Sequence, residues 1–304
     1  METMKVFVTG ATGFVGRELT RQLLSAGHLP VCLVQPGCEE KLVSPRQLVI
    51  HSGDVTRPDS LEGILRGCDA VIHLVGIIRE DAERGITFDR LHVEGTGNML
   101  AAAKRQGVRR FIQMSSNGAD PHGETVYYRS KWRAEEAVRH SGLNWTIFRP
   151  SIIFGKEDNF CNKLAELIRR LPVVPVIGDG QYRMAPVAVE DVVKGLLTSL
   201  HRPDLEERII YCCGSEAYTF NELLDLVGLA LGRGRVRKFH QPLYLARPVV
   251  ARMENRRDFP ITLDQLTMLL KGNVCSGKPS LETLGISPRS FPETLRDYLS
   301  PVPS

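Results

Sequence analysis

The 304-residue sequence lacks the features that mark membrane-spanning and exported proteins. It has no apolar run near the roughly 20 residues that a membrane-spanning helix needs, because His73, Arg79 and several prolines interrupt the longest candidates. Its first residues lead directly into an apolar strand pattern, without the basic segment and hydrophobic stretch of a signal peptide. We therefore expect a cytoplasmic protein, and the sequence leaves peripheral attachment to a membrane open.

The sequence also lacks the patterns of metal-binding and nucleic-acid-binding proteins. Its seven cysteines are scattered, with no C-x-x-C pair and no His-rich ligand spacing, so we expect reduced core thiols and no metal site. The 39 basic residues barely exceed the 35 acidic ones, which is too slight an excess to predict nucleic-acid binding. With 42% hydrophobic residues and no repeat or low-complexity tract, the chain can build a large core.

Apolar runs of strand length alternate with helix-period segments through the first half of the chain. This alternation predicts parallel strands with right-handed crossovers, hence an α/β fold of Rossmann type with a doubly wound parallel sheet over residues 1–150. The expected strands are residues 4–9, 31–34, 47–51, 70–74, 110–114 and 144–148, and the expected helices are 14–26, 60–66, 88–106 and 127–140.

After residue 150 the pattern changes to shorter segments with more proline and glycine. We expect residues 151–304 to form a smaller, mainly helical substrate lobe. Segments near 185–215, with strand-like runs at 185–189 and 208–212, are expected to return to the Rossmann sheet. The helices of this lobe are expected at residues 160–170, 220–231, 263–270 and 291–299.

A glycine-rich turn, T-G-A-T-G-F-V-G at residues 9–16, separates the first strand from the first helix. Gly10 permits a sharp turn, Gly13 lets the backbone approach a pyrophosphate, and Gly16 allows close packing of helix on strand. The helix N-terminus adds amide donors and a positive dipole. The turn therefore predicts a dinucleotide site and makes residues 1–150 an NAD(P)-binding domain.

The ends of the next strands suggest how the rest of the cofactor is held. Gln35 stands where a carboxylate would hold a ribose diol, so the sequence slightly favours NADP(H) over NAD(H). Asp54 is placed to accept a hydrogen bond from adenine, with a turn or helix cap as the alternative role. The expected cofactor-binding residues are Gly10, Thr12, Gly13, Phe14, Val15, Gly16, Gln35, Asp54, Val55, Leu74, Val75, Gly76 and Lys131.

Tyr127 and Lys131 lie four residues apart, and so on one face of an expected helix. A lysine ammonium stabilises a phenolate, so we expect it to lower the pKa of Tyr127 and to make this residue a proton donor or acceptor. Ser116 follows the fifth strand and could orient a substrate oxygen. The expected catalytic group is Tyr127, Lys131 and Ser116, and a solvated helical pair is the alternative for the first two. His73 is interpreted as a packed core residue.

Several motifs resemble those of the extended or atypical short-chain dehydrogenase/reductase superfamily, which includes NAD-dependent epimerases and dehydratases. They are T-G-A-T-G-F-V-G, G-D-V, H-L-V-G, H-V-E-G-T, S-S-N-G-A, Y-Y-R-S-K and F-R-P-S-I-I-F-G. In the fourth, His92 stands where extended members carry Asn. Three later motifs, L-P-V-V-P-V-I-G-D-G, P-V-A-V-E-D-V-V and I-T-L-D-Q-L-T-M-L-L-K-G-N-V, resemble bacterial relatives of the NADPH-binding accessory subunit of respiratory complex I.

The resemblance implies two functions. The first is an NAD(P)-dependent oxidoreductase or nucleotide-sugar-epimerase-like enzyme that uses Tyr127, Lys131 and Ser116. The second is a non-catalytic NADP(H)-binding accessory or assembly module. The substrate stays open, a homodimer or a membrane-complex partner is compatible with either function, and no nucleic-acid partner is expected. We interpret the basic run at residues 233–238 as a charged edge strand, with anionic lipid or nucleic acid as the alternative.

Overall fold

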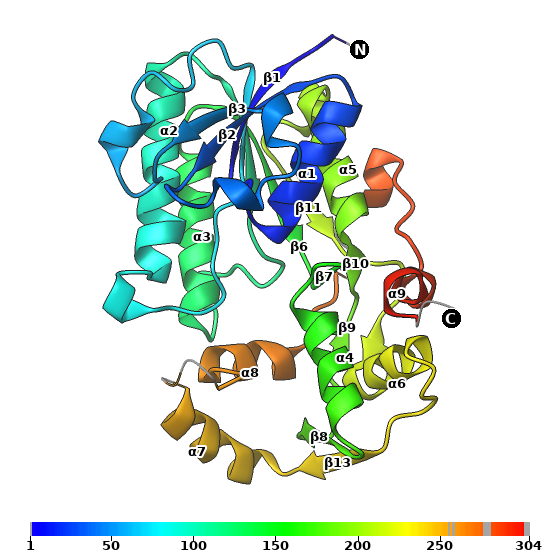
Figure 1. Cartoon of the computed structure of the whole chain (residues 1–304). Coiled ribbons are helices and arrows are strands. Elements are labelled where there is room, and N and C mark those ends of the chain that lie inside the picture. Colours follow the sequence, from blue (N-terminus) through cyan, green and yellow to red (C-terminus); the bar gives the residue numbers. More distant parts are fainter. Residues whose placement is uncertain (1, 255, 257–258, 276–280, 301–304) are drawn as a thin grey trace. The chain divides into compact units, whose positions relative to one another are not determined.

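The computed structural model describes residues 2–254, 256, 259–275 and 281–300, and its chain divides into two compact units (Figure 1). The first unit comprises residues 1–149 and 192–211, and the second comprises residues 150–191 and 212–304. The chain therefore leaves the first unit once, builds part of the second, and returns before finishing it.

The first unit is built on a seven-stranded sheet in the order β11-β6-β5-β4-β1-β2-β3. The register sets Thr9 beside Leu33 and His73, so the carboxyl ends of three strands meet at one edge. Neighbours from β3 to β6 pair in parallel, as the strand–helix alternation predicts. The strands are β1 (Lys5–Thr9), β2 (Leu29–Val34), β3 (Val49–Ser52), β4 (Ala70–His73), β5 (Arg110–Met114), β6 (Asn144–Pro150) and β11 (Arg208–Cys212).

Helices cover both faces of this sheet, with α2 and α3 on one side and α1 and α5 on the other (Figure 1). They are α1 (Phe14–Ser25), α2 (Gly95–Arg105), α3 (Val126–Arg139) and α5 (Val189–Leu200), and a π-helical turn (Asp89–Glu94) leads into α2. The α/β doubly wound fold is confirmed. The helix expected at residues 60–66 is wrong, because Gly63 and Gly67 adopt left-handed φ angles of 72° and 70°, and only a short 3-10 turn (Pro58–Leu61) forms.

The second unit combines short strand pairs with helices. Its strands pair as β7 (Ile153–Phe154) with β10 (Val187–Ala188), β8 (Val174–Ile177) with β13 (Lys238–Gln241), and β9 (Arg183–Met184) with β12 (Tyr218–Thr219). Its helices are α4 (Phe160–Arg170), α6 (Phe220–Ala230), α7 (Leu243–Met253), α8 (Leu263–Lys271) and α9 (Phe291–Leu299). Residues 208–212 join the large sheet as expected, but the run at 185–189 does not, because its strand pairs with β7.

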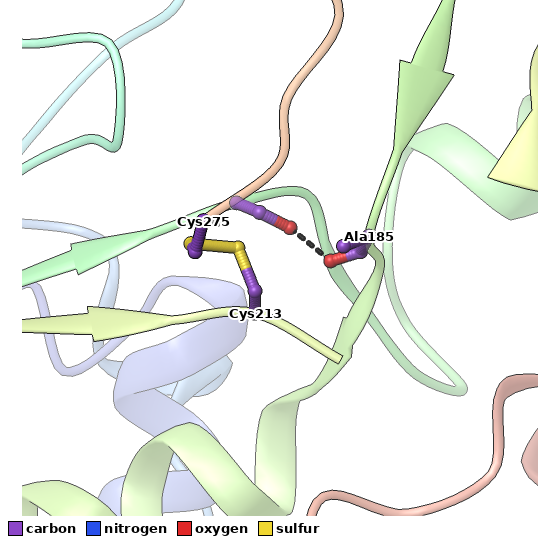
Figure 2. Close-up of a disulfide and its surroundings, with 4 residues drawn as sticks. Ala185, Cys213 and Cys275 are labelled. Carbon is purple, nitrogen blue, oxygen red and sulfur yellow. Dashed lines mark hydrogen bonds between the residues drawn. A yellow bond between two sulfur atoms is a disulfide. The ribbon is translucent and has the colours of Figure 1, made fainter. Parts of the chain in front are cut away.

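A disulfide between Cys213 and Cys275 corrects the expectation that all seven cysteines are reduced (Figure 2). Backbone pairing at Ala185 brings the two segments together. The Ala185 amide donates to the Asn273 carbonyl (2.9 Å), and its carbonyl accepts from the Gly214 amide (3.1 Å). The two cysteines are 62 residues apart in sequence, so their proximity arises from the tertiary structure.

Helices long and apolar enough to cross a bilayer do not occur in the described part of the chain.

Candidate functional site

The glycine turn between β1 and α1 has the geometry that a bound pyrophosphate needs. Gly10 has a φ angle of 73°, and a Cβ atom on Gly16 would lie only 2.0 Å from the Gly10 carbonyl oxygen. α1 begins at Phe14 with Gly13 as its N-cap, without a side-chain cap and without an acidic residue in its first turn. The amides at the start of this helix therefore face no competing carboxylate, and the turn fits an anionic diphosphate group.

Gln35 and Asp54, two of the expected cofactor residues, lie together beyond β2 and β3. The Gln35 side-chain amide donates to Asp54 Oδ2 (2.9 Å), while Asp54 Oδ1 accepts from the amide (2.8 Å) and hydroxyl (2.9 Å) of Thr56. Burial alone would raise the pKa of Asp54, but these hydrogen bonds hold the pKa below its usual value. Asp54 is thus a charged residue that organises a turn, which was the alternative role predicted for it.

Tyr127 and Ser116 meet at the carboxyl edge of the sheet. Tyr127 lies at the start of α3, just after Thr125, whose hydroxyl caps the helix by accepting from the Tyr128 amide (3.1 Å). The hydroxyl groups of Tyr127 and Ser116 share a hydrogen bond. Burial raises the pKa of Tyr127, and the contact with Ser116 offsets only part of this effect. The predicted lowering of this pKa is therefore wrong, and Tyr127 is a neutral phenol.

Lys131 is buried one helical turn after Tyr127. Its ammonium group donates to the Met114 carbonyl at the end of β5 (3.2 Å). Burial lowers the pKa of Lys131 to about 8, against the opposing charge of Glu135. A Cβ atom on Gly76 would lie 2.9 Å from Lys131 Nζ, so the backbone beyond β4 approaches the ammonium closely because residue 76 is a glycine. The helical pair is therefore buried, which excludes the alternative of a solvated surface pair.

Two buried histidines adjoin Lys131, and the sequence indicated only the packing role of His73. His73 Nδ1 lies 2.7 Å from the Thr9 hydroxyl. His92 Nε2 accepts from the Ile77 amide (3.0 Å), which leaves the proton on Nδ1 for the Ser130 hydroxyl (2.8 Å). Burial, aided by the Lys131 charge, lowers the pKa of His73 to about 3 and that of His92 to about 2. Both rings are neutral, and His92 links the loop after β4 to α3.

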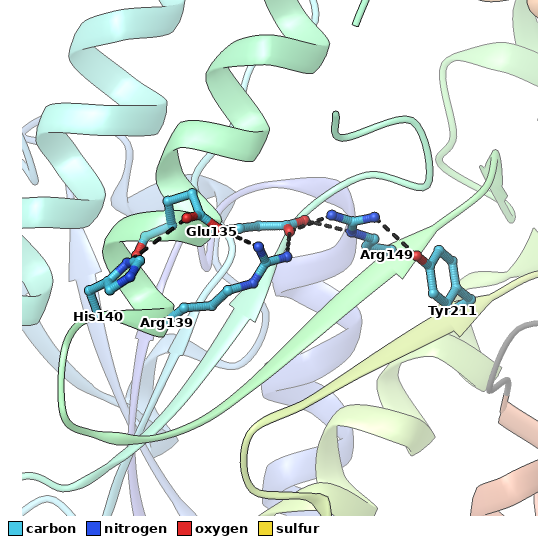
Figure 3. A network of polar contacts seen from close by, with 6 residues as sticks. Glu135, Arg139, His140, Arg149 and Tyr211 are labelled. Carbon is cyan, nitrogen blue, oxygen red and sulfur yellow. Dashed lines mark hydrogen bonds and ion pairs between the residues drawn. The ribbon is translucent and has the colours of Figure 1, made fainter. Parts of the chain in front are cut away.

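An ion-pair network anchors the rest of α3 to the sheet (Figure 3). The fully buried Glu135 carboxylate accepts two hydrogen bonds from Arg149 (2.8 and 2.6 Å) and one from Arg139 (2.9 Å). Arg149 also donates to the Tyr211 hydroxyl in β11 (3.0 Å). The sequence analysis missed this network, although a charged residue at the end of a buried strand, here Arg149 in β6, is a signal for a buried partner.

Within the described residues, no group of three or more His, Cys, Asp or Glu side chains is placed to hold a metal ion. The candidate site consists of the glycine turn, the Gln35–Asp54 pair, and the buried cluster of Ser116, Tyr127 and Lys131. All of these residues belong to the first unit.

Comparisons with known proteins show the family of the chain. Residues 6–214 match the model of the NAD dependent epimerase/dehydratase family. The chain is 32% identical to a ceramide reductase of Caulobacter vibrioides, over 72% of this chain and 68% of that protein. It is 26% identical to the mitochondrial NADH-ubiquinone oxidoreductase 40 kDa subunit of Neurospora crassa, over 96% of this chain and 78% of that subunit.

The fold is similar to that of UDP-glucose 4-epimerase from Thermotoga maritima, with a TM-score of 0.74 at 21% identity, over 97% of this chain and 98% of that one. The matches to the first three curated relatives span 62% to 68% of the relatives' own length. The resemblances to the epimerase/dehydratase superfamily and to complex I subunits, predicted from the motifs, are confirmed. The chain belongs to the NAD-dependent epimerase/dehydratase family.

Proposed function

We propose that the first unit binds a nicotinamide dinucleotide at the turn of residues 10–16 and reduces a carbonyl group beside Tyr127. The observation that carries this proposal is the hydrogen bond between the Tyr127 and Ser116 hydroxyls, with the Lys131 ammonium buried one helical turn away. A phenol with a raised pKa stays protonated at neutral pH. It is therefore a proton donor, which favours the reductive direction.

When bound, the reduced nicotinamide supplies the hydride that adds to the carbonyl carbon. Tyr127 gives its phenol proton to the carbonyl oxygen, so that an alcohol forms and a phenolate remains. Lys131 stabilises that phenolate, because a pKa of about 8 leaves its amine protonated in most molecules at pH 7. Solvent then returns the proton to Tyr127. Ser116 holds the substrate oxygen at hydrogen-bond distance from the phenol.

Replacement of Tyr127 with phenylalanine tests the chemistry. Tyr127→Phe removes the proton donor and should lower turnover by about 10²–10⁴-fold while leaving NADPH affinity unchanged. Tyr128→Phe is the matched control, because Tyr128 is the adjacent buried tyrosine and lies only three residues from Lys131. NADPH oxidation can be followed with carbonyl forms of ceramides and UDP-sugars, the substrate classes suggested by the relatives' names. Equal turnover of the two variants would disprove the role of Tyr127.

The preferred cofactor is NADP(H) in this proposal. The stretch Val34-Gln35-Pro36 after β2 itself carries no carboxylate, and hydrogen bonds from Gln35 and Thr56 compensate the charge of the neighbouring Asp54. Calorimetric titration with NADPH and NADH should give tighter binding of NADPH. Gln35→Asp should reverse the preference, because it places a negative charge where the 2′-phosphate would sit. Tighter binding of NADH by the wild type would contradict this assignment.

A cofactor-binding structural role is the second candidate, favoured by the match of 96% of this chain to the Neurospora complex I subunit. In that case NADPH should raise the thermal midpoint of the wild type and of Tyr127→Phe equally, and neither protein should turn over either substrate class. Turnover that depends on Tyr127 would exclude this candidate.

A further inference from the structure

Helix α7 carries large apolar side chains that are exposed. Its buried residues are Ala246 and Val250, which lie four residues apart and therefore on one face, and α7 contacts α8. An ordinary surface helix would have polar residues opposite such a face. Here the large apolar side chains away from it are exposed: Tyr244 (74%), Leu245 (57%) and Val249 (52%).

The same region carries charge of one sign. Between Asp225 and Glu254 the sequence holds six Lys or Arg residues and no Asp or Glu. One of the six, Lys238, forms an ion pair with Asp225 (2.5 Å). Arg247 and Arg252 belong to α7 itself, and no ion pair joins them to an acidic residue in the described part of the chain. Phe239 in β13, just before the helix, is 60% exposed. The basic run at residues 233–238 was expected to be an edge strand, but most of it precedes β13. Protection of a sheet edge from aggregation therefore does not account for these charges.

We propose that α7 and the preceding β13 form a membrane-docking surface that lies on an anionic lipid bilayer. An interfacial helix of this kind buries aromatic and aliphatic side chains at the boundary of headgroups and acyl chains, while its arginines bind lipid phosphates. The acid-free stretch favours a negatively charged surface, and the exposed apolar face distinguishes a bilayer from a merely polyanionic partner. This proposal is independent of whether the first unit turns over a substrate.

Co-flotation of the full-length chain with lipid vesicles tests the surface. The protein should float with vesicles of phosphatidylglycerol and phosphatidylcholine in equal parts, and not with vesicles of phosphatidylcholine alone. Arg247→Gln combined with Arg252→Gln should weaken binding roughly thirtyfold, from about 1 kcal/mol for each charge. Tyr244→Ser and Leu245→Ser should each weaken it about tenfold, because each removes an inserted apolar side chain.

Matched substitutions outside the surface serve as controls. Leu229→Ser replaces a leucine on α6 that is also 57% exposed, and Arg46→Gln with Arg66→Gln removes two exposed charges from the first unit. These variants should float like the wild type, and circular dichroism should show that every variant is folded. No flotation, equal flotation with both vesicle types, or equal effects of surface and control substitutions would overturn the proposal. Sedimentation could also show that the wild type is a stable dimer, that Leu245→Ser converts it to a monomer, and that neither form binds vesicles. That result would overturn the proposal as well.

Discussion

Mild acid should destabilise the first unit through His73 and His92, the two buried histidines that adjoin Lys131. In the unfolded chain both rings take up protons below about pH 6.5, whereas burial holds the pKa of His73 at about 3 and that of His92 at about 2 in the folded protein. The unfolded state therefore binds more protons as the pH falls below 6.5, so stability that is complete above this pH is progressively lost. Between pH 7 and pH 5 the loss is about 2 kcal/mol for each histidine and about 4 kcal/mol together.

Urea unfolding at several pH values, followed through the fluorescence of the buried Trp145, measures this loss. His92→Asn lowers stability at every pH because it removes hydrogen bonds, but it should also remove about half of the pH-dependent loss that His73 and His92 cause together. Carboxylates and other groups contribute equally to both proteins and cancel in the comparison. His122→Asn is the control, since His122 is exposed and should leave the dependence unchanged. If His92→Asn keeps the full wild-type dependence, the assignment of a buried neutral ring is refuted.

Three further predictions concern the anchor of α3, the glycine turn and the disulfide. Glu135→Gln should lower the free energy of unfolding by about 3 kcal/mol in urea titrations, because the buried Arg149 charge loses its counterion, and an unchanged value would contradict the network. Gly13→Val should lower the thermal midpoint of the free protein only slightly, since its Cβ would lie 3.2 Å from the Gly10 carbonyl oxygen, but it should lose the rise caused by NADPH. Gly16→Ala should lower the midpoint much more, because its Cβ would lie 2.0 Å from the same oxygen. A normal NADPH-induced rise in Gly13→Val would overturn the turn assignment. Cys213→Ser should cost about 4 kcal/mol for a closed loop of 62 residues, and a reductant should lower the wild type to the same level.

The sequence predicts the central sheet well because its strands are apolar and separated by helix-period segments. Strand β5 has the expected bounds of 110–114, and helices α4 and α9 match the expected ranges 160–170 and 291–299. Helix α7 could not be predicted in the same way. Its apolar residues do not form a single core-facing stripe, and Pro248 interrupts the helical signal.

The candidate site was predictable where it depends on neighbours in the chain, and not where it depends on distant ones. The spacing of Tyr127 and Lys131 follows from the helical period, and Ser116 follows from its place after β5. The partners of His92 and Glu135 could not be deduced, since Ser130 and Arg149 come close only when α3 packs on the sheet. The raised pKa of Tyr127 likewise depends on burial, which the sequence spacing does not contain.

The return of residues 192–211 to the first unit has a consequence for biosynthesis. Two buried arginines before residue 150 donate hydrogen bonds to residues of this returning segment. Arg110 donates to the Ser199 carbonyl (2.8 Å), and Arg149 donates to the Tyr211 hydroxyl. When residue 149 has just left the ribosome, each arginine lacks this one acceptor and β6 is an open edge of the sheet. The nascent sheet stays incomplete until about sixty more residues have emerged, so a chain stalled or truncated near residue 150 is exposed to edge-to-edge aggregation.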